Sequence, residues 1–249
     1  MNRFENKNVI VTGAASGIGQ ATAIRLAQEG ANVACIDIDE DELKKTASTI
    51  ASDNNTSLAV PCDISDPTSV KNTIASIQGD FGQIHALCNV AGVLSSSHSH
   101  EVEFAEWNRV LSVNLTGTFL MCQACIPHLL ESRGYIVNTS SSAALGGHPW
   151  MAAYAASKGG ILSLTRSLAL EYVEQGLNVN AVIPGAIVTP LHQGFQMPKG
   201  ANANLIKRII PFVPYAQPEV VASTIAFLAS DEASYINGSE LRVDGGMLT

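Results

Sequence analysis

The sequence predicts an α/β fold in which seven parallel strands form one doubly wound sheet with helices on both faces, within a single domain of residues 1–249. Short apolar, β-branched runs alternate with longer segments of helical periodicity, as expected for parallel strands joined by helical crossovers. In addition, 46% of the residues are apolar and only 14% are charged. This composition suits a sheet that is buried on both faces.

The strands and helices can be placed in order along the chain. The predicted strands are residues 8–12, 32–37, 58–61, 86–89, 135–139, 178–183 and 240–243. Helical periodicity begins near Gly17, Asp39, Pro67, Glu103, Ala153 and Pro218. At the third of these starts, the cap residues Ser65 and Asp66 precede Pro67, which suits a first helical turn because the N–H that it lacks would have no partner there.

Residues 189–215 do not fit the alternation of strands and helices. The segment contains four prolines and three aromatic residues. A connection of this length in a compact domain is usually a lid or a binding loop, so we expect a substrate lid at about 189–215. The alternative is a mobile surface insertion.

Charge and cysteine usage limit the partners and the compartment. The formal net charge of −8, with only 14 scattered lysines and arginines, disfavours binding to nucleic acid or to an anionic membrane. Residues 1–8 are polar and lead directly into a strand, so we expect no signal peptide, no membrane span and a cytoplasmic protein. The five cysteines are expected to be reduced and buried, including Cys122 and Cys125 in their C-x-x-C spacing.

A glycine-rich turn joins the first strand to the first helix. It carries Gly13, Ser16, Gly17, Ile18 and Gly19. Glycines let the backbone turn sharply and approach a pyrophosphate, whose charge is met by N–H groups and by the positive end of the helix. A simple strand-to-helix turn is the alternative interpretation.

The second strand ends at Asp37, roughly 20 residues after the glycines, where a carboxylate can accept both ribose hydroxyls of NAD. The same carboxylate would repel the 2′-phosphate of NADP, and neither Ala14, Ala15 nor Ile38 offers a guanidinium to bind it. We therefore expect NAD. A basic residue from a distant loop would weaken this preference, and Asp37 alone is also compatible with a plain strand-end turn.

Tyr154 and Lys158 are spaced i, i+4 at the start of a predicted helix, which places both side chains on one face. An adjacent ammonium stabilises a phenolate, so Tyr154 can serve as an acid/base toward an alcohol or carbonyl. A solvated surface pair is the alternative. The strand at 135–139 also delivers three serines, 140–142, to the sheet edge where ligands bind, and one hydroxyl there can hold the substrate oxygen. A polar strand end or turn is the alternative interpretation of these serines.

Over essentially its whole length, the chain resembles the short-chain dehydrogenase/reductase family, whose single domain has a Rossmann fold. The residues that match family motifs are Thr12 to Gly19, Cys62-Asp63 followed by Ile64, Asn89-Val90-Ala91-Gly92, Asn114, Tyr154 to Lys158, Pro184-Gly185 with Ile187 and Thr189, and Val243 to Gly246. The resemblance implies that Asp63, Ile64, Asn89, Ala91 and Gly92 bind the cofactor. It also implies that Pro184, Gly185, Ile187 and Thr189 contact the nicotinamide.

The resemblance further selects Ser141 as the serine that polarises the substrate oxygen. By the same comparison Tyr154 is the acid/base, Lys158 binds ribose and lowers the pKa of the tyrosine, and Asn114 holds a water that links Lys158 to solvent. Two departures stand out: Val90 replaces a frequent asparagine, and residues 211–216 replace a glycine- and arginine-bearing pattern. The second departure leaves substrate preference open.

We expect no metal site, because His98, His100, His148 and His192 lack a clear set of acid or thiolate partners. Trp150, Met151 and Leu145 are expected to form an apolar pocket wall. The leading hypothesis is an NAD-dependent oxidoreductase that acts on a small-molecule secondary alcohol or ketone. The alternatives are a 3-oxoacyl thioester reductase and a non-catalytic NAD-binding sensor. The family pattern also implies a homotetramer, built partly on the helices from Glu103 and Ala153.

Overall fold

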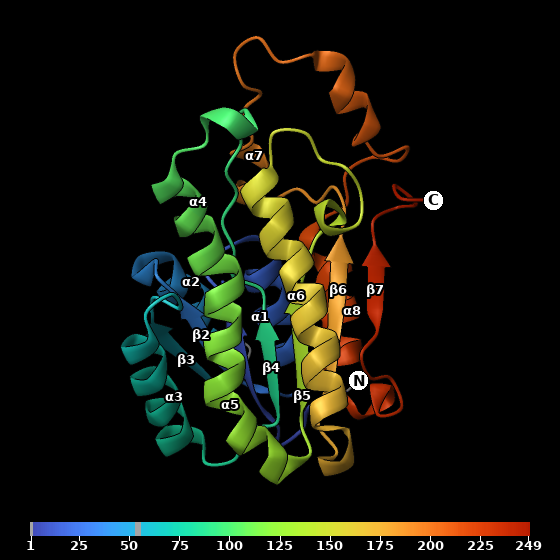
Figure 1. The fold of residues 1–249 in the computed structure, drawn as a ribbon. Coiled ribbons are helices and arrows are strands. Elements are labelled where there is room, and N and C mark those ends of the chain that lie inside the picture. Colours follow the sequence, from blue (N-terminus) through green and yellow to red (C-terminus); the bar gives the residue numbers. More distant parts are fainter. Residues whose placement is uncertain (1, 53–55) are drawn as a thin grey trace.

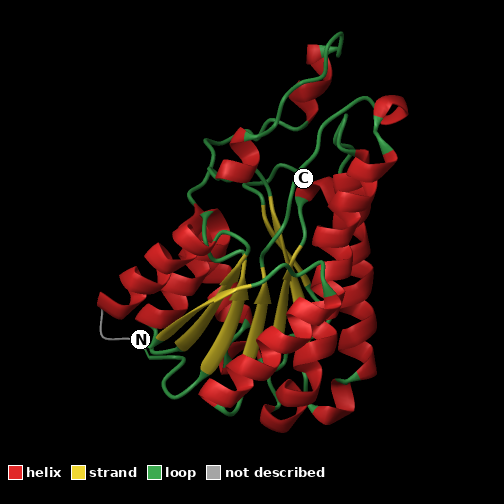
Figure 2. Ribbon diagram, turned by 90° about the vertical axis from the view of Figure 1, so that its left-hand side faces the viewer, coloured by secondary structure: helices red, strands yellow, loops and turns green. Residues whose placement is uncertain are grey.

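A computed structural model describes residues 2–52 and 56–249. One sheet of seven parallel strands has the order β3-β2-β1-β4-β5-β6-β7, with helices on both sides (Figures 1 and 2). The strands are β1 (Asn8–Thr12), β2 (Asn32–Asp37), β3 (Ser57–Pro61), β4 (Ala86–Asn89), β5 (Tyr135–Thr139), β6 (Asn178–Pro184) and β7 (Glu240–Val243). The fold class is as predicted.

Two apolar cores sandwich the sheet. The α-helices are α1 (Gly17–Gln28), α2 (Glu40–Ser52), α3 (Pro67–Phe81), α4 (Phe104–Leu111), α5 (Thr118–Ser132), α6 (Ala152–Glu171), α7 (Pro190–Gln193) and α8 (Pro218–Leu228). Helices α1, α2 and α8 cover one face, while α3, α5 and α6 cover the other (Figure 1). Along β1, Val9 and Val11 therefore join the first core while Ile10 joins the second.

Most helix and strand boundaries lie within one residue of those predicted from local signals in the sequence. Asp66 caps α3 by accepting hydrogen bonds from the backbone N–H groups of Thr68 and Ser69. Strand β3 begins at Ser57 and β6 runs to Pro184, each one residue beyond the prediction, because these residues pair with Val33 and Val243 of the neighbouring strands.

The helix expected from Glu103 is interrupted by a π-helical turn. The turn, Ser112–Gly117, separates α4 from α5. Such turns often mark functional sites, and this one directs the side chain of Asn114 into the interior. By length and composition alone, Phe104–Ser132 could span a membrane. However, Met121, Cys122 and others on its inner face pack into the core beside the sheet.

The segment 189–215 has structure of its own. Besides α7 it contains a 3-10 helix, Ala203–Arg208. Pro190 occupies the first turn of α7, and the hydroxyl of Thr189 accepts a hydrogen bond from the backbone N–H of His192. Other 3-10 turns are Ser99–Glu101, Ser142–Ala144, Val173–Gln175 and Asp231–Ala233. The long connection lies beyond the carboxyl ends of the strands (Figure 1).

Candidate active site

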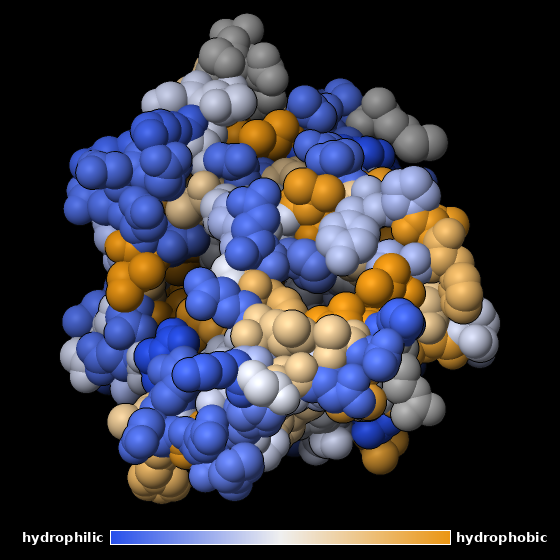
Figure 3. Space-filling model, turned by 90° about the horizontal axis from the view of Figure 1, so that it is seen from above, coloured by the Kyte–Doolittle hydropathy of each residue, from blue (hydrophilic) through white to orange (hydrophobic). Residues whose placement is uncertain are grey.

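A cavity of about 680 Å³ opens at the carboxyl edge of the sheet. Strands β1 and β4 are neighbours there although β2 and β3 intervene in sequence, so the strand order reverses at this point. Ligands of open α/β sheets bind at such a switch point. Figure 3, which looks down on this edge, shows apolar side chains in the middle of the face and toward its right-hand margin, with polar side chains over most of the left-hand part.

The glycine-rich turn forms one wall of the cavity. Gly13 has a φ of +71°, and a Cβ there would lie 2.8 Å from the backbone of Ala91. A Cβ on Gly19 would lie 2.0 Å from the carbonyl oxygen of Gly13. Neither position can hold a side chain, so the backbone lies bare beside the amino end of α1, where Ser16, Gly17 and Ile18 also line the cavity.

Asp37 lies in the same wall with its carboxylate fixed by the backbone. Its Oδ2 accepts a hydrogen bond from the N–H of Ala15 at 3.1 Å, and its Oδ1 accepts one from the N–H of Asp39 at 3.1 Å. Arg109 is the only guanidinium among the residues found to line the cavity, and Glu106 holds it in a pair at 2.7 Å. Arg109 therefore already has a carboxylate partner.

Asp63 and Ile64 line the cavity next to Asp37. The carboxylate of Asp63 accepts hydrogen bonds from both the N–H and the hydroxyl of Ser65, at 2.9 and 2.7 Å. Ile38, which is 73% exposed, adds an apolar surface to this end of the cavity. A flat, partly polar group such as adenine would meet both surfaces.

Asn89 is not brought into the cavity, although Ala91 and Gly92 are. Its side chain is buried and donates to the side-chain oxygen of Asn138 at 2.9 Å and to the sulfur of Cys122 at 3.3 Å. The structure therefore places Asn89 as a support between the ends of β4 and β5.

Asn114 is also absent from the residues that line the cavity. Its Oδ1 accepts from the N–H of Val93 at 2.7 Å, and its amide donates to the carbonyl of Val93 and to the hydroxyl of Ser157, both at 3.0 Å. Its own carbonyl accepts the hydroxyl of Thr118 at 2.7 Å. Its side chain thus ties the segment after β4 to α6.

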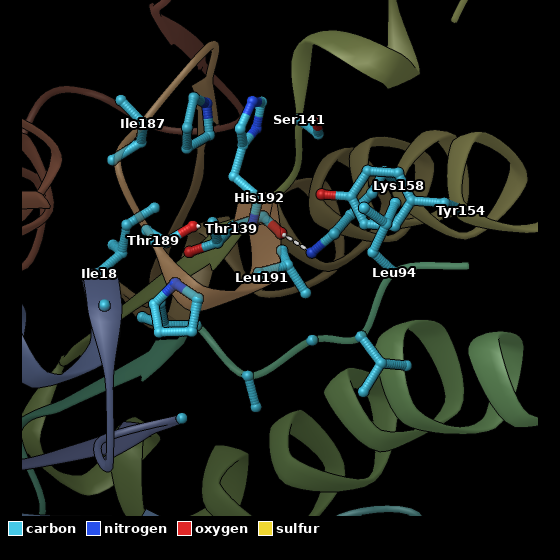
Figure 4. A pocket seen from close by; sticks show the side chains of 18 of the residues that line it. Ile18, Leu94, Thr139, Ser141, Tyr154, Lys158, Ile187, Thr189, Leu191 and His192 are labelled. Carbon is cyan, nitrogen blue, oxygen red and sulfur yellow. Dashed lines mark hydrogen bonds between the residues drawn. The ribbon is translucent and has the colours of Figure 1, made fainter. Parts of the chain in front are cut away.

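Tyr154 and Lys158 lie together deep in the cavity, on the first turns of α6 (Figure 4). The Lys158 ammonium lies 5.7 Å from the centre of the Tyr154 ring and donates to the carbonyl of Thr139 at 2.8 Å. Burial lowers the pKa of Lys158 to about 8. Burial also raises the pKa of Tyr154, although a hydrogen bond with Ser141 works against that rise.

The three serines after β5 have different partners. Ser140 donates its hydroxyl to the carbonyl of Lys158 at 2.8 Å. Ser142 pairs with the ring of His148 at 3.3 Å. Ser141 is the serine whose hydroxyl interacts with Tyr154, and it also accepts the N–H of Ala143. Of the three serines, Ser141 is thus the one whose hydroxyl is bonded to Tyr154.

Pro184, Gly185, Ile187 and Thr189 line the wall opposite Tyr154. A Cβ on Gly185 would lie 2.8 Å from the Cα of Asp244, so the motif at the end of β7 packs directly against it. The sequence did not indicate Thr139, whose hydroxyl points into the cavity (Figure 4). This hydroxyl is buried and has no hydrogen-bond partner among the described residues.

The residues that line the substrate end of the cavity differ from those expected. Met151 lines it, but Trp150 and Leu145 do not, and Leu145 is 49% exposed. Apolar side chains from segments far apart in sequence form the wall instead: Leu94, Phe195, Ile206, Ile209, Ile210 and Met247. A periodic pattern within one segment cannot reveal such a surface.

The histidines considered as metal ligands lie in different places. His148 and His192 line the cavity, whereas the ring of His98 contacts the carbonyl of Lys199 at 3.1 Å. Across residues 2–52 and 56–249, no three histidine, cysteine or acidic side chains gather as a metal site would require. The five cysteines are buried, and burial raises the pKa of Cys122 to about 12.

Known proteins share this sequence and architecture. A family model described as enoyl-(acyl carrier protein) reductase matches residues 13–248. D-threitol dehydrogenase of Mycolicibacterium smegmatis is 37% identical, over 98% of this chain and 94% of its own. 3beta-hydroxysteroid dehydrogenase 1 of Eggerthella lenta is 40% identical, over 98% and 94%. The crystal structure of levodione reductase superposes with a TM-score of 0.89 at 31% identity, covering 98% of both chains.

Proposed function

The chain belongs to the short-chain dehydrogenase/reductase family, and on that premise we propose that it is an NAD-dependent dehydrogenase in which Tyr154 is the acid/base. The family assigns the reaction class: the chain is an oxidoreductase that transfers a hydride between a nicotinamide and a secondary alcohol or ketone. The observation that carries our proposal is the placement of Ser141, Tyr154 and Lys158 around one point in the cavity.

The residues in the cavity fit a dinucleotide. Gly13 and Gly19 leave bare backbone at the amino end of α1, which suits the pyrophosphate. The buried hydroxyl of Thr139 has no partner among the described residues and would gain one from the nicotinamide end. Asp37, Asp63 and Ile64 would hold the adenosine, while Pro184, Gly185, Ile187 and Thr189 would hold the nicotinamide. When bound, this cofactor donates or accepts the hydride.

In the proposed mechanism, Tyr154 takes the proton of the substrate hydroxyl during oxidation and returns it during reduction. Ser141 holds the substrate oxygen, and the Lys158 ammonium stabilises the phenolate. The side chain of Asn114 is engaged with Val93 and Ser157, so we assign the relay water to the backbone carbonyl of Asn114. That oxygen accepts the Thr118 hydroxyl and has a second lone pair for a water that relays the proton.

Cofactor choice is the first prediction. We expect Asp37→Ala to raise the ratio of kcat/KM for NADP to that for NAD by at least about tenfold, because the variant loses the repulsion of a 2′-phosphate. Initial rates with both cofactors measure the ratio. Asp41→Ala, which removes an exposed carboxylate further along α2, is the matched control and should leave the ratio unchanged. An unchanged ratio in Asp37→Ala would remove this role of the carboxylate.

The substrate is proposed to be a secondary alcohol of small to medium size, in line with the threitol and hydroxysteroid dehydrogenases among the relatives. The competitor is a 3-oxoacyl thioester reductase, in line with the 3-oxoacyl-[acyl-carrier-protein] reductase among the relatives. A screen of alcohols, ketones and a 3-oxoacyl thioester with NAD(H) and NADP(H), followed by nicotinamide absorbance, separates the two. A protein that binds NAD and turns over nothing in the screen would instead be a sensor.

We further propose a cytoplasmic homotetramer, with residues 189–215 as a lid over the cavity. Apolar side chains lie exposed on the helices expected at the subunit contacts: Phe104 is 74% exposed, Phe119 41% and Leu170 78%. Their burial between subunits would be favourable. We expect light scattering at micromolar concentration to give about four times the chain mass of 26.2 kDa. A monomer mass would overturn this assembly.

A further inference from the structure

The substrate end of the cavity contains a buried polar pair that the reaction does not use. Ser142 and His148 both line the cavity, and Ser142 directly follows the serine that holds the reacting oxygen. Ser142 is only 3% exposed, and its hydroxyl lies 3.3 Å from Nε2 of His148. The same cavity is also lined by apolar residues, among them Leu94, Met151 and Met247.

The hydrogen bonds of His148 determine which group of the pair is the donor. Its Nδ1 lies 3.2 Å from the carbonyl oxygen of Gly146, which can only accept, so Nδ1 carries a proton. Burial lowers the pKa of His148, which favours the neutral ring. In the neutral ring, Nε2 is then an acceptor, and the hydroxyl of Ser142 must donate to it.

This arrangement leaves Ser142 with a free acceptor and no free donor. Its single hydrogen points to His148, and no donor to its hydroxyl oxygen is found among the described residues. A ligand group that donates a hydrogen bond, such as a hydroxyl, satisfies the lone pairs of this oxygen, whereas a methylene leaves them unpaired. A buried polar group without a partner is costly, so the pair discriminates between two such substrates.

We propose that Ser142 and His148 form a subsite for a second hydroxyl group on the substrate, close to the reacting carbon, so that the chain prefers diols to mono-alcohols of the same skeleton. The proposal rests on the proposed dehydrogenase function. His192 also lines the cavity, but its ring packs edge-on against Tyr215 at 4.9 Å and has no hydrogen bond to a serine among the described residues.

The test compares the best mono-alcohol found in the screen, starting with cyclohexanol, with the vicinal diol of the same skeleton. We expect the wild-type chain to favour the diol by about tenfold in kcat/KM, the size of one hydrogen bond in a buried site. Ser142→Ala should remove most of that preference, mainly by raising KM for the diol. His148→Phe should weaken the preference too, and it provides a second variant should Ser142→Ala fold poorly.

Ser140→Ala is the matched control, because it deletes a neighbouring hydroxyl that is bonded to the carbonyl of Lys158. It should change both rates in parallel and leave their ratio intact. A wild-type chain with no preference for the diol would overturn the subsite, as would an equal loss on both substrates in Ser142→Ala. A ratio that responds to His192→Phe instead would also overturn it. If no alcohol is turned over at all, the dehydrogenase proposal itself fails.

Discussion

Tyr154→Phe is expected to lower kcat by at least about 100-fold, because the variant keeps the ring but loses the oxygen that exchanges a proton with the substrate. Burial raises the pKa of this phenol in the free protein, and the hydrogen bond from Ser141 offsets only part of the rise. The Lys158 ammonium and the positive charge of an oxidised nicotinamide both favour the phenolate. In the wild type, alcohol oxidation should therefore accelerate as pH rises and more phenolate forms.

Steady-state rates and calorimetric titration with NAD together check this result. We expect the affinity for NAD to change only a few-fold in Tyr154→Phe, since the glycine turn and Asp37 are untouched. Tyr172→Phe is the control: this tyrosine lies at the far end of the same helix, beside Glu171. Near-normal turnover in Tyr154→Phe, with the same pH profile, would rule out the tyrosine as acid/base.

The fold was predictable because its signals are local. Asp66 and Pro67 start α3 by their own chemistry, and the β-branched runs need only a buried sheet around them. The exceptions depend on partners elsewhere in the chain. Ser57 and Pro184 extend their strands only because Val33 and Val243 lie opposite them.

The sequence predicted which residues belong to the candidate site better than it predicted where their side chains point. The spacing from Tyr154 to Lys158 fixes a shared helix face, so these two side chains meet in the cavity as expected. Residue type alone does not say where an amide points. Asn89 and Asn114 turn away from the cavity because buried groups on β5, α6 and the segment after β4 need their hydrogen bonds.

The prediction of the pocket wall was wrong for Trp150 for a related reason. Trp150 adopts a left-handed backbone conformation with a φ of +66°, and its carbonyl accepts the N–H of Ser97. That conformation is uncommon for a bulky residue, and no signal in the sequence around Trp150 predicted it. The wall is completed by Phe195, in the segment 189–215, and by Met247 near the end of the chain, which only the folded chain brings together.

Lys158→Met is expected to abolish most activity and yet to stabilise the cofactor-free protein. The ammonium is 3% exposed, its pKa is lowered to about 8 by burial alone, and it forms no ion pair with the described residues. Against an unfolded pKa near 10.5, the penalty at pH 7 is about 3 kcal/mol. A methionine carries no charge and so avoids this penalty. However, it leaves the carbonyl of Thr139 without a hydrogen-bond partner, which offsets about 1–2 kcal/mol of the gain in stability.

The dependence on pH separates this effect from ordinary repacking. Between pH 8 and 10.5 the unfolded chain binds more protons at this lysine than the folded one, so wild-type stability rises with pH through that window. The variant lacks this contribution. Its advantage in thermal unfolding, about 2–6 °C at pH 7, should therefore shrink as the pH approaches 10. If the difference stays constant across that range, Lys158 does not carry a strained buried charge, and its conservative replacement by arginine would be the next substitution to compare.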